Sequence, residues 1–161
     1  MDNRIDKQNY YLDMAEAALN RGTCLRRNYG AIIVNNDSIV STGYTGAPRG
    51  RKNCCDLKEC IREKLNVPRG ERYELCRSVH AEQNAIISAS RKDTIGATMY
   101  MVGKDAKTNE YDAKNYDSYD WYCITKLINS IIISNMSRLY RIAFISRNHL
   151  EKLENQDYQF F

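Results

Sequence analysis

The stretch SVHAEQNAI, residues 78–86, places His80 and Glu82 two residues apart in an otherwise apolar segment. The only other histidine in the chain is His149. Residues 78–90 contain few helix breakers, and their apolar side chains fall on overlapping faces of a helix. We therefore expect a buried helix here, with the histidine and the glutamate near its start.

Side chains two residues apart on a regular helix point about 200° away from each other, so His80 and Glu82 cannot share one ion in mid-helix. Their roles must therefore differ. At the N-terminus of a helix, the histidine is suited to bind a metal while the glutamate exchanges protons with a substrate. The alternative is a hydrogen-bonded core histidine beside a first-turn glutamate that the helix dipole favours.

Upstream of this stretch, the sequence predicts a helix followed by a β-hairpin. Apolar residues recur at helical spacing over residues 6–21, and Gly22 stands where a C-cap would. Two β-branched runs, 31–34 and 38–43, are separated by the polar residues 35–37, which is typical of a hairpin turn.

The remaining segments alternate between loops, strands and helices. Residues 44–74 mix glycine, proline and charged residues, so we expect a long functional loop with a short helix near residues 57–65. Residues 97–103 read as a strand, and a polar, tyrosine-rich connection follows them. The last expected elements are a buried helix at 121–129, strands at 131–134 and 139–146, and a short helix after Arg147.

This order of elements predicts an α/β fold in one domain, residues 1–161. The alternation of strands and helices favours a three-layer α-β-α sandwich around a central mixed sheet, and the expected strands number five. A chain of 161 residues with 43% hydrophobic and 27% charged residues fits such a globular domain.

Composition also bounds the location and the partners. No apolar run approaches the roughly 20 residues that span a bilayer, and the first residues lack the apolar core of a signal peptide. We therefore expect a cytoplasmic protein, whose six cysteines are metal ligands, catalytic thiols or core residues rather than disulfide partners. The net charge of +4 suits a small anionic ligand, although a solvated surface explains it equally well.

Several motifs occur in an order that is similar to one known family. They are RGTCLRRNYGAIIV (21–34), STGYTGAPRG (41–50), NCCD (53–56), CRSVHAEQNAI (76–86), GATMYMVG (96–103) and CITKLINS (123–130). Over nearly its whole length the chain resembles the deoxycytidylate deaminases of the cytidine deaminase-like superfamily. The resemblance implies hydrolysis of dCMP to dUMP, with His80 as a zinc ligand and Glu82 as the group that carries protons.

One part of the family pattern is missing. The family takes two further zinc ligands from P-C-x-x-C, whereas this chain has only Cys123 in the matching region. If Cys123 is the first of the two, Lys126 falls on the second and is a poor ligand. If it is the second, Asp120 falls on the first and keeps a side chain that can bind zinc. We prefer the set His80, Asp120 and Cys123.

The alternative for this region is a deaminase fold without its catalytic metal. Asp120 is also a suitable N-cap for the helix expected at 121–129, and Cys123 is then a small buried residue. Such a protein would be catalytically impaired and would act by binding nucleotides or a partner.

The resemblance also implies substrate contacts and a second metal. Arg26 or Arg27 would face the 5′-phosphate, and Thr45 stands where the family has an asparagine that contacts the sugar. A structural zinc would use four of the cysteines. The substrate-side set is then Arg26, Thr45, Gly46 and Ala81, and the cysteine set is Cys24, Cys54 (or Cys55), Cys60 and Cys76.

The family further implies a homo-oligomer, with dCTP and dTTP as effectors in some branches. We expect no membrane partner. A base within a nucleic acid is a third candidate substrate, because tyrosines are frequent between residues 111 and 122 and aromatic rings stack on bases. Tyrosines in a polar loop more often pack at subunit contacts, so we do not expect a nucleic-acid partner.

Overall fold

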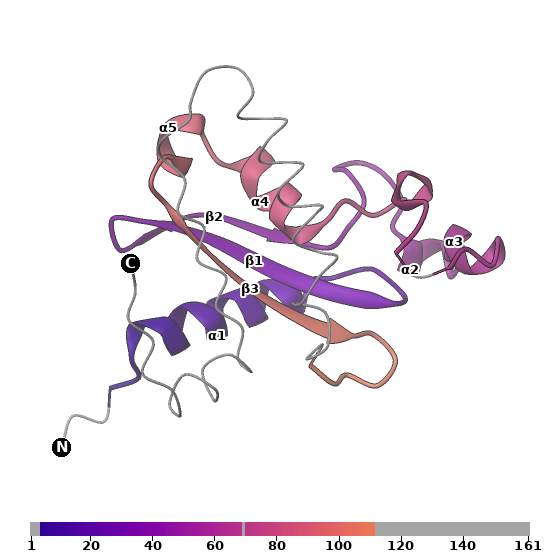
Figure 1. The fold of residues 1–161 in the computed structure, drawn as a ribbon, viewed down its shortest axis with the longest axis horizontal. Helices are drawn as coiled ribbons and strands as arrows, with labels where there is room; N and C mark the ends of the chain where they lie inside the picture. Colours follow the sequence, from indigo (N-terminus) through magenta and orange to yellow (C-terminus); the bar gives the residue numbers. More distant parts are fainter. Residues whose placement is uncertain (1–3, 69, 112–161) are drawn as a thin grey trace.

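The computed structural model describes residues 4–68 and 70–111 (Figure 1). The helix expected at 121–129, the last two expected strands, the terminal helix, and the candidate ligands Asp120 and Cys123 all lie outside the described residues. A single domain over residues 1–161 and a sheet of five strands therefore stay predictions.

Three strands form the described sheet, in the order β2-β1-β3: β1 (Arg27–Asn35), β2 (Ser38–Tyr44) and β3 (Thr98–Asp105). Both neighbouring pairs are antiparallel. β1 is the central strand, and its residues from Gly30 to Val34 are all buried. A central strand covered on both faces reads as a continuous apolar run, which is why AIIV identifies it so clearly in the sequence.

The predicted hairpin is confirmed. Asn36 and Asp37 link β1 to β2 with φ angles of 48° and 62°, the left-handed conformation that a two-residue hairpin turn requires. β1 begins at Arg27, four residues before the expected start at residue 31. The extra length comes from pairing with β3, where Arg27 lies opposite Asp105, and such a long-range partner leaves no local signal.

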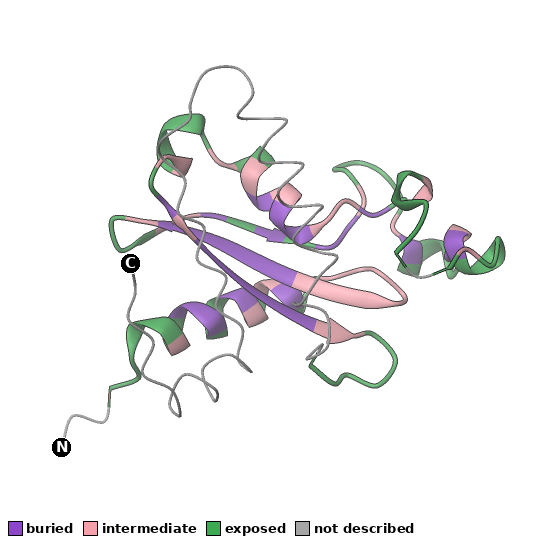
Figure 2. Cartoon of the chain, viewed as in Figure 1, coloured by how far each residue is buried: buried purple, intermediate pink, exposed green. Residues whose placement is uncertain are grey.

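Helices cover both faces of this sheet (Figure 1). α1 (Lys7–Leu19) packs on one face and α4 (Ala81–Ser88) on the other. Neighbouring residues of β1 point to opposite faces, so Ile32 belongs to the core under α1 and Ile33 to the core under α4. Figure 2 shows the buried residues concentrated on β1 and on the sides of the two helices that face it.

The prediction that Gly22 caps the first helix is wrong. α1 ends at the C-cap Asn20, whose φ of −62° is right-handed, and Gly22 is not among the glycines with positive φ. Gly22 is instead required for close packing, because a Cβ there would lie 2.5 Å from Oδ1 of Asn28. That oxygen accepts a hydrogen bond from the backbone N–H of Cys24 at 2.9 Å.

The long loop contains two short helices and a 3₁₀ turn rather than one helix. These are α2 (Cys54–Leu57), α3 (Ile61–Lys64) and η1 (Tyr73–Leu75). α2 ends because Lys58 takes a left-handed φ of 51°. All three lie to one side of the sheet, with most of their residues exposed (Figures 1 and 2).

The helix expected over residues 78–90 is shorter than predicted. It begins at Ala81, and a separate short helix, α5 (Arg91–Thr94), follows Ser90, whose side chain caps it by accepting from the N–H of Asp93. No helix in the described ranges is long and apolar enough to cross a membrane.

A polar network ties α1 to the hairpin turn. The Tyr11 hydroxyl donates a hydrogen bond to Oδ1 of Asp37 at 2.7 Å, and Lys7 forms an ion pair with the same carboxylate. The hydrogen bond to Asp37 raises the pKa of Tyr11 to about 12. Lys7 and Tyr11 in turn hold the pKa of Asp37 below its usual value.

Replacing Tyr11 should change how stability depends on alkaline pH. A tyrosine whose pKa is raised in the folded state stabilises it fully below the unfolded pKa of 10.0, and that contribution is lost as the pH rises towards 12. Tyr11→Phe should therefore lower the free energy of unfolding at pH 8 and flatten its decline between pH 10 and 12. Urea unfolding across this range measures both effects.

The matched control is Tyr10→Phe, because Tyr10 is 45% exposed on the same helix. This variant should follow the wild-type pH dependence. Parallel stability curves for the wild type and Tyr11→Phe would contradict the assignment.

Candidate functional site

His80 and Glu82 meet at the start of α4. Nδ1 of His80 lies 3.0 Å from Oε1 of Glu82, and the two side chains are 27% and 8% exposed. His80 is the N-cap of the helix, with an extended backbone (φ −68°, ψ 153°). The 200° separation expected within a regular helix therefore does not apply, and the two side chains are in contact.

Local sequence explains why the helix begins after His80. The side chain of Gln83 accepts a hydrogen bond from the backbone N–H of His80 at 3.4 Å, and the N–H of Asn84 donates to the carbonyl of His80 at 3.0 Å. Glu82 lies in the first turn, where the helix dipole favours a negative charge. The prediction that both residues lie near the start of a helix is confirmed, and the helix is buried on one side only, since Ala81, Glu82 and Ala85 are buried while Ile87 is exposed.

The sheet fixes the position of α4 through a very close backbone contact. A Cβ at Gly43 of β2 would lie 2.2 Å from the carbonyl oxygen of Ala81 and 2.3 Å from the backbone nitrogen of Ala85. Ser41, two residues earlier on the same face, donates a hydrogen bond to the carbonyl of Ala85 at 2.6 Å. Ala81 is fully buried by this contact, so its methyl group forms part of the core.

The glycine-rich loop is attached to the segment that precedes His80. Gly46 and Val79 exchange two backbone hydrogen bonds, of 3.2 and 2.8 Å, as an isolated antiparallel bridge. Both backbone polar groups of Gly46 are therefore engaged with the chain. The glycine holds the loop against the site, and a substrate contact at Gly46 stays a prediction.

Two asparagines that the sequence interpretation did not assign to the site also hold this loop. Oδ1 of Asn53 accepts from the N–H of Ala47 at 3.1 Å and from the hydroxyl of Thr23 at 3.0 Å. Asn84 of α4 donates to the carbonyl of Tyr44 at 2.8 Å. No local signal identifies these roles, because the partners of both asparagines come from other segments of the chain.

Thr45 lies at the site with its hydroxyl group turned to the sheet. Its Oγ1 accepts a hydrogen bond from the N–H of Tyr29 at 3.0 Å, and the residue is 7% exposed. The backbone N–H of Thr45 also donates to the carbonyl of Tyr29 at 3.0 Å. These contacts give Thr45 a structural role, and its contact with a sugar stays a prediction.

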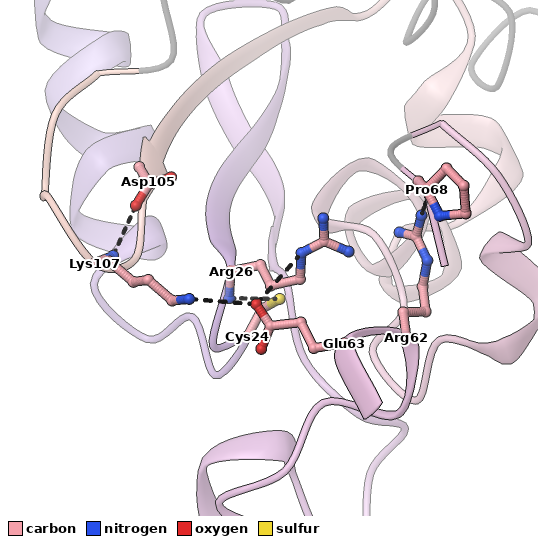
Figure 3. A network of polar contacts seen from close by, with 7 residues as sticks. All are labelled: Cys24, Arg26, Arg62, Glu63, Pro68, Asp105 and Lys107. Atoms are coloured by element: carbon pink, nitrogen blue, oxygen red, sulfur yellow. Dashed lines mark hydrogen bonds and ion pairs between the residues drawn. The ribbon is translucent and has the colours of Figure 1, made fainter. Parts of the chain in front are cut away.

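Arg26 faces a carboxylate from the long loop (Figure 3). Its Nε lies 3.9 Å from Oε1 of Glu63, and Lys107 reaches the same oxygen at 3.4 Å. The backbone N–H of Arg26 donates to Sγ of Cys24 at 3.5 Å. The Arg26 and Glu63 side chains are 30% and 43% exposed, so their attraction is screened by water and an incoming anion can compete for the guanidinium.

The four cysteines predicted to share a metal are connected by electrostatic interactions between their side chains. Burial raises the pKa of the Cys54 thiol, and the neighbouring Cys24 and Cys60 raise it further. Burial also raises the pKa of Cys76, with Cys24 again contributing. All five cysteines of the described ranges are free thiols. Within these ranges, however, no three His, Cys, Asp or Glu side chains are arranged to hold a metal.

Comparison with known proteins places most of this chain in one family. Residues 5–110 match the family model described as the cytidine and deoxycytidylate deaminase zinc-binding region. The deoxycytidylate deaminase of Mycobacterium phage D29 is 39% identical over 103 residues, which cover 61% of this chain and 78% of that protein. The deoxycytidylate deaminase of Schizosaccharomyces pombe is 35% identical over 83 residues, 52% of this chain but only 26% of its own length.

A solved structure is also similar. The dCMP deaminase of the cyanophage S-TIM5 in its apo form shares 27% identity with a TM-score of 0.43, covering 60% of this chain and 67% of its own. A second structure of that protein is a complex with dCMP and dUMP.

Replacing Gly43 tests the seating of α4. Gly43→Ala should place its methyl group in the backbone of α4 and destabilise the protein by about 1–3 kcal/mol, the usual cost of overpacking. Denaturant unfolding measures the loss. Thr42→Ala, at the neighbouring exposed position of β2, is the control and should cost less than about 1 kcal/mol. Equal stability of the two variants would contradict the close contact.

Proposed function

The chain belongs to the cytidine and deoxycytidylate deaminase zinc-binding family and so has its cytidine deaminase-like α/β fold; from this premise we propose that it hydrolyses dCMP to dUMP and ammonia. The observation that carries the proposal is the contact of 3.0 Å between Nδ1 of His80 and Oε1 of Glu82. The choice of dCMP is supported by relatives named deoxycytidylate deaminase in phage D29 and in two yeasts.

The donor chemistry of the site fits the zinc that the family description names. His80 supplies an imidazole nitrogen beside a carboxylate, and we assign Asp120 and Cys123 as the other two ligands. Nitrogen, oxygen and sulfur donors all bind zinc, although the harder oxygen in place of a second sulfur should lower the affinity. Zinc, when bound, lowers the pKa of water so that hydroxide is present near neutral pH.

Glu82 carries the protons of the reaction. Its carboxylate is 8% exposed and lies next to His80, where it can take a proton from the attacking water. It passes this proton to N3 of the pyrimidine while the C4–O bond forms. Glu82 then takes the proton of the new hydroxyl on C4 and gives it to the amino group as the C4–N bond breaks and the carbonyl forms, so that water and dCMP give dUMP and ammonia.

Arg26 is the group that we assign to the 5′-phosphate. A guanidinium presents paired N–H donors that match phosphate oxygens. Its present partner, Glu63, is 3.9 Å away and 43% exposed, so exchanging this carboxylate for a phosphate costs little. The predicted homo-oligomer, the effectors dCTP and dTTP, and the cytoplasmic location stay predictions.

A second zinc, with a structural role, is the further part of the proposal. Its ligands are Cys24, Cys54, Cys60 and Cys76. The support is electrostatic: Cys24 and Cys60 contribute to the raised pKa of Cys54, and Cys24 and Cys54 contribute to that of Cys76, so a dication among these groups would favour the thiolates. The four sulfurs must draw closer together than in the described structure to form a tetrahedral site.

Substituting Glu82 tests the enzymatic proposal. Glu82→Gln keeps the size of the side chain but removes the carboxylate, so dCMP turnover should fall at least about 100-fold with the fold intact. The assay follows dUMP and ammonia, and circular dichroism checks folding. Glu71→Gln, at an exposed position of the long loop, is the control and should keep full activity. Turnover by Glu82→Gln equal to that of the wild type would refute the proposal.

Metal content tests the ligand sets. Gently purified protein should hold about two zinc ions per chain, one in each proposed site. Cys123→Ser should lose one ion together with activity, whereas Cys54→Ser should lose the other. Cys55→Ser is the matched control, since the Cys55 thiol is exposed next to the buried Cys54.

A wild type that contains no zinc and releases no ammonia from dCMP would instead support the catalytically impaired alternative. Greater activity on oligonucleotides than on free dCMP would support the nucleic-acid alternative.

A further inference from the structure

Arg62 is a buried cation in the long loop, and it does not belong to any site described above. It lies on α3 and is 5% exposed. One terminal nitrogen donates to the carbonyl of Pro68 at 3.1 Å, but Nε has no hydrogen-bond partner in the described part of the chain. A buried charge with an incomplete set of partners is costly, so its position calls for another favourable contact.

That contact is the ring of Tyr73. The guanidinium carbon of Arg62 lies 4.4 Å from the ring centroid, over its face, as in a cation–π interaction. Tyr73 lies on η1, and the preceding Arg72 has a left-handed φ of 51° that turns the chain there. The face of the ring is therefore held by α3, although the tyrosine is still 37% exposed.

The edge-on partner of the same ring is His80. The centroids of Tyr73 and His80 are 5.6 Å apart, and their planes are inclined by 75°, a T-shaped arrangement that aromatic rings prefer. Glu82 touches the imidazole at Nδ1. The imidazole thus lies between an aromatic ring from the loop and a carboxylate from α4, which together restrict its rotation about Cβ–Cγ.

We propose that Tyr73, anchored by Arg62, is a positioning residue for the imidazole of His80. The buried guanidinium fixes the face of the tyrosine, and the tyrosine fixes the plane of the histidine. A metal ligand that is held in its binding orientation loses less conformational freedom when the ion binds. The inference rests on the proposed function, because the orientation of His80 matters for zinc binding only if His80 is a zinc ligand.

The presence of only two histidines among the 161 residues makes the proposal measurable. Imidazole proton signals of the metal-free protein come from His80 and His149 alone, and a His149→Gln variant assigns them. The affinity of His80 for Zn²⁺ follows from competition with a chelator, monitored through the His80 signal. Zinc bound elsewhere, including at the cysteines, does not enter this measurement.

Tyr73→Leu should move the His80 signal, leave that of His149 in place, and weaken Zn²⁺ binding at His80 about tenfold, within the range for residues that orient metal ligands. Tyr73→Phe keeps the ring and should match the wild type. Arg62→Met, which keeps the apolar stem, should move the His80 signal in the same direction as Tyr73→Leu. Tyr10→Leu is the control, because Tyr10 is an exposed tyrosine on α1.

The proposal is overturned if Tyr73→Leu leaves the Zn²⁺ affinity at His80 unchanged, because loss of the ring current alone moves the His80 signal. It is equally overturned if Tyr73→Phe behaves like Tyr73→Leu, since the aromatic ring would then not be the group that orients His80. The signals of the metal-free protein do not depend on turnover. A wild type that fails to deaminate dCMP while Tyr73→Leu weakens Zn²⁺ binding at His80 would reject the proposed function and keep the positioning role.

Discussion

The contact between the backbones of α4 and β2 is the constraint on which the site depends. Gly43 has no side chain, so the carbonyl of Ala81 and the nitrogen of Ala85 can lie directly on the strand. The hydrogen bond from Ser41 to Ala85 then fixes the helix along the strand direction. His80 immediately precedes this contact. The sheet therefore fixes the backbone position of His80, and with it the positions that the imidazole and the Glu82 carboxylate can occupy.

The long loop makes further contacts that hold the segment around His80 in place. The bridge between Gly46 and Val79 holds one part of the loop beside His80, and Asn53 holds the loop to itself. The ring of Tyr73, which also belongs to the loop, packs against the imidazole of His80. A segment with few contacts to the core thus still contributes to the geometry at the head of α4.

Local patterns in the sequence were sufficient for the main elements of the described residues and for the placing of His80 and Glu82 at the start of a helix. The hairpin followed from AIIV and its polar turn, and the pair of His80 and Glu82 followed from two chemically distinctive residues at the start of a helix. What the sequence could not reveal depends on distant partners. The early start of β1 needs β3, the true role of Gly22 needs Asn28, and the ring of Tyr73 meets His80 only after the loop has folded.

α1 and α4 each pack against a glycine, and the two glycines belong to adjacent strands. Substitutions in the core under one helix therefore have little effect on the core under the other. α1 lies against Gly30 of β1 on one face, while α4 lies against Gly43 of β2 on the other. Residues of the two cores do not share a face of the sheet, and the energetic effects of changes at sites without common partners usually add. Alterations beneath α1 can therefore accumulate, or be engineered for heat resistance, with little disturbance of the face that α4 covers.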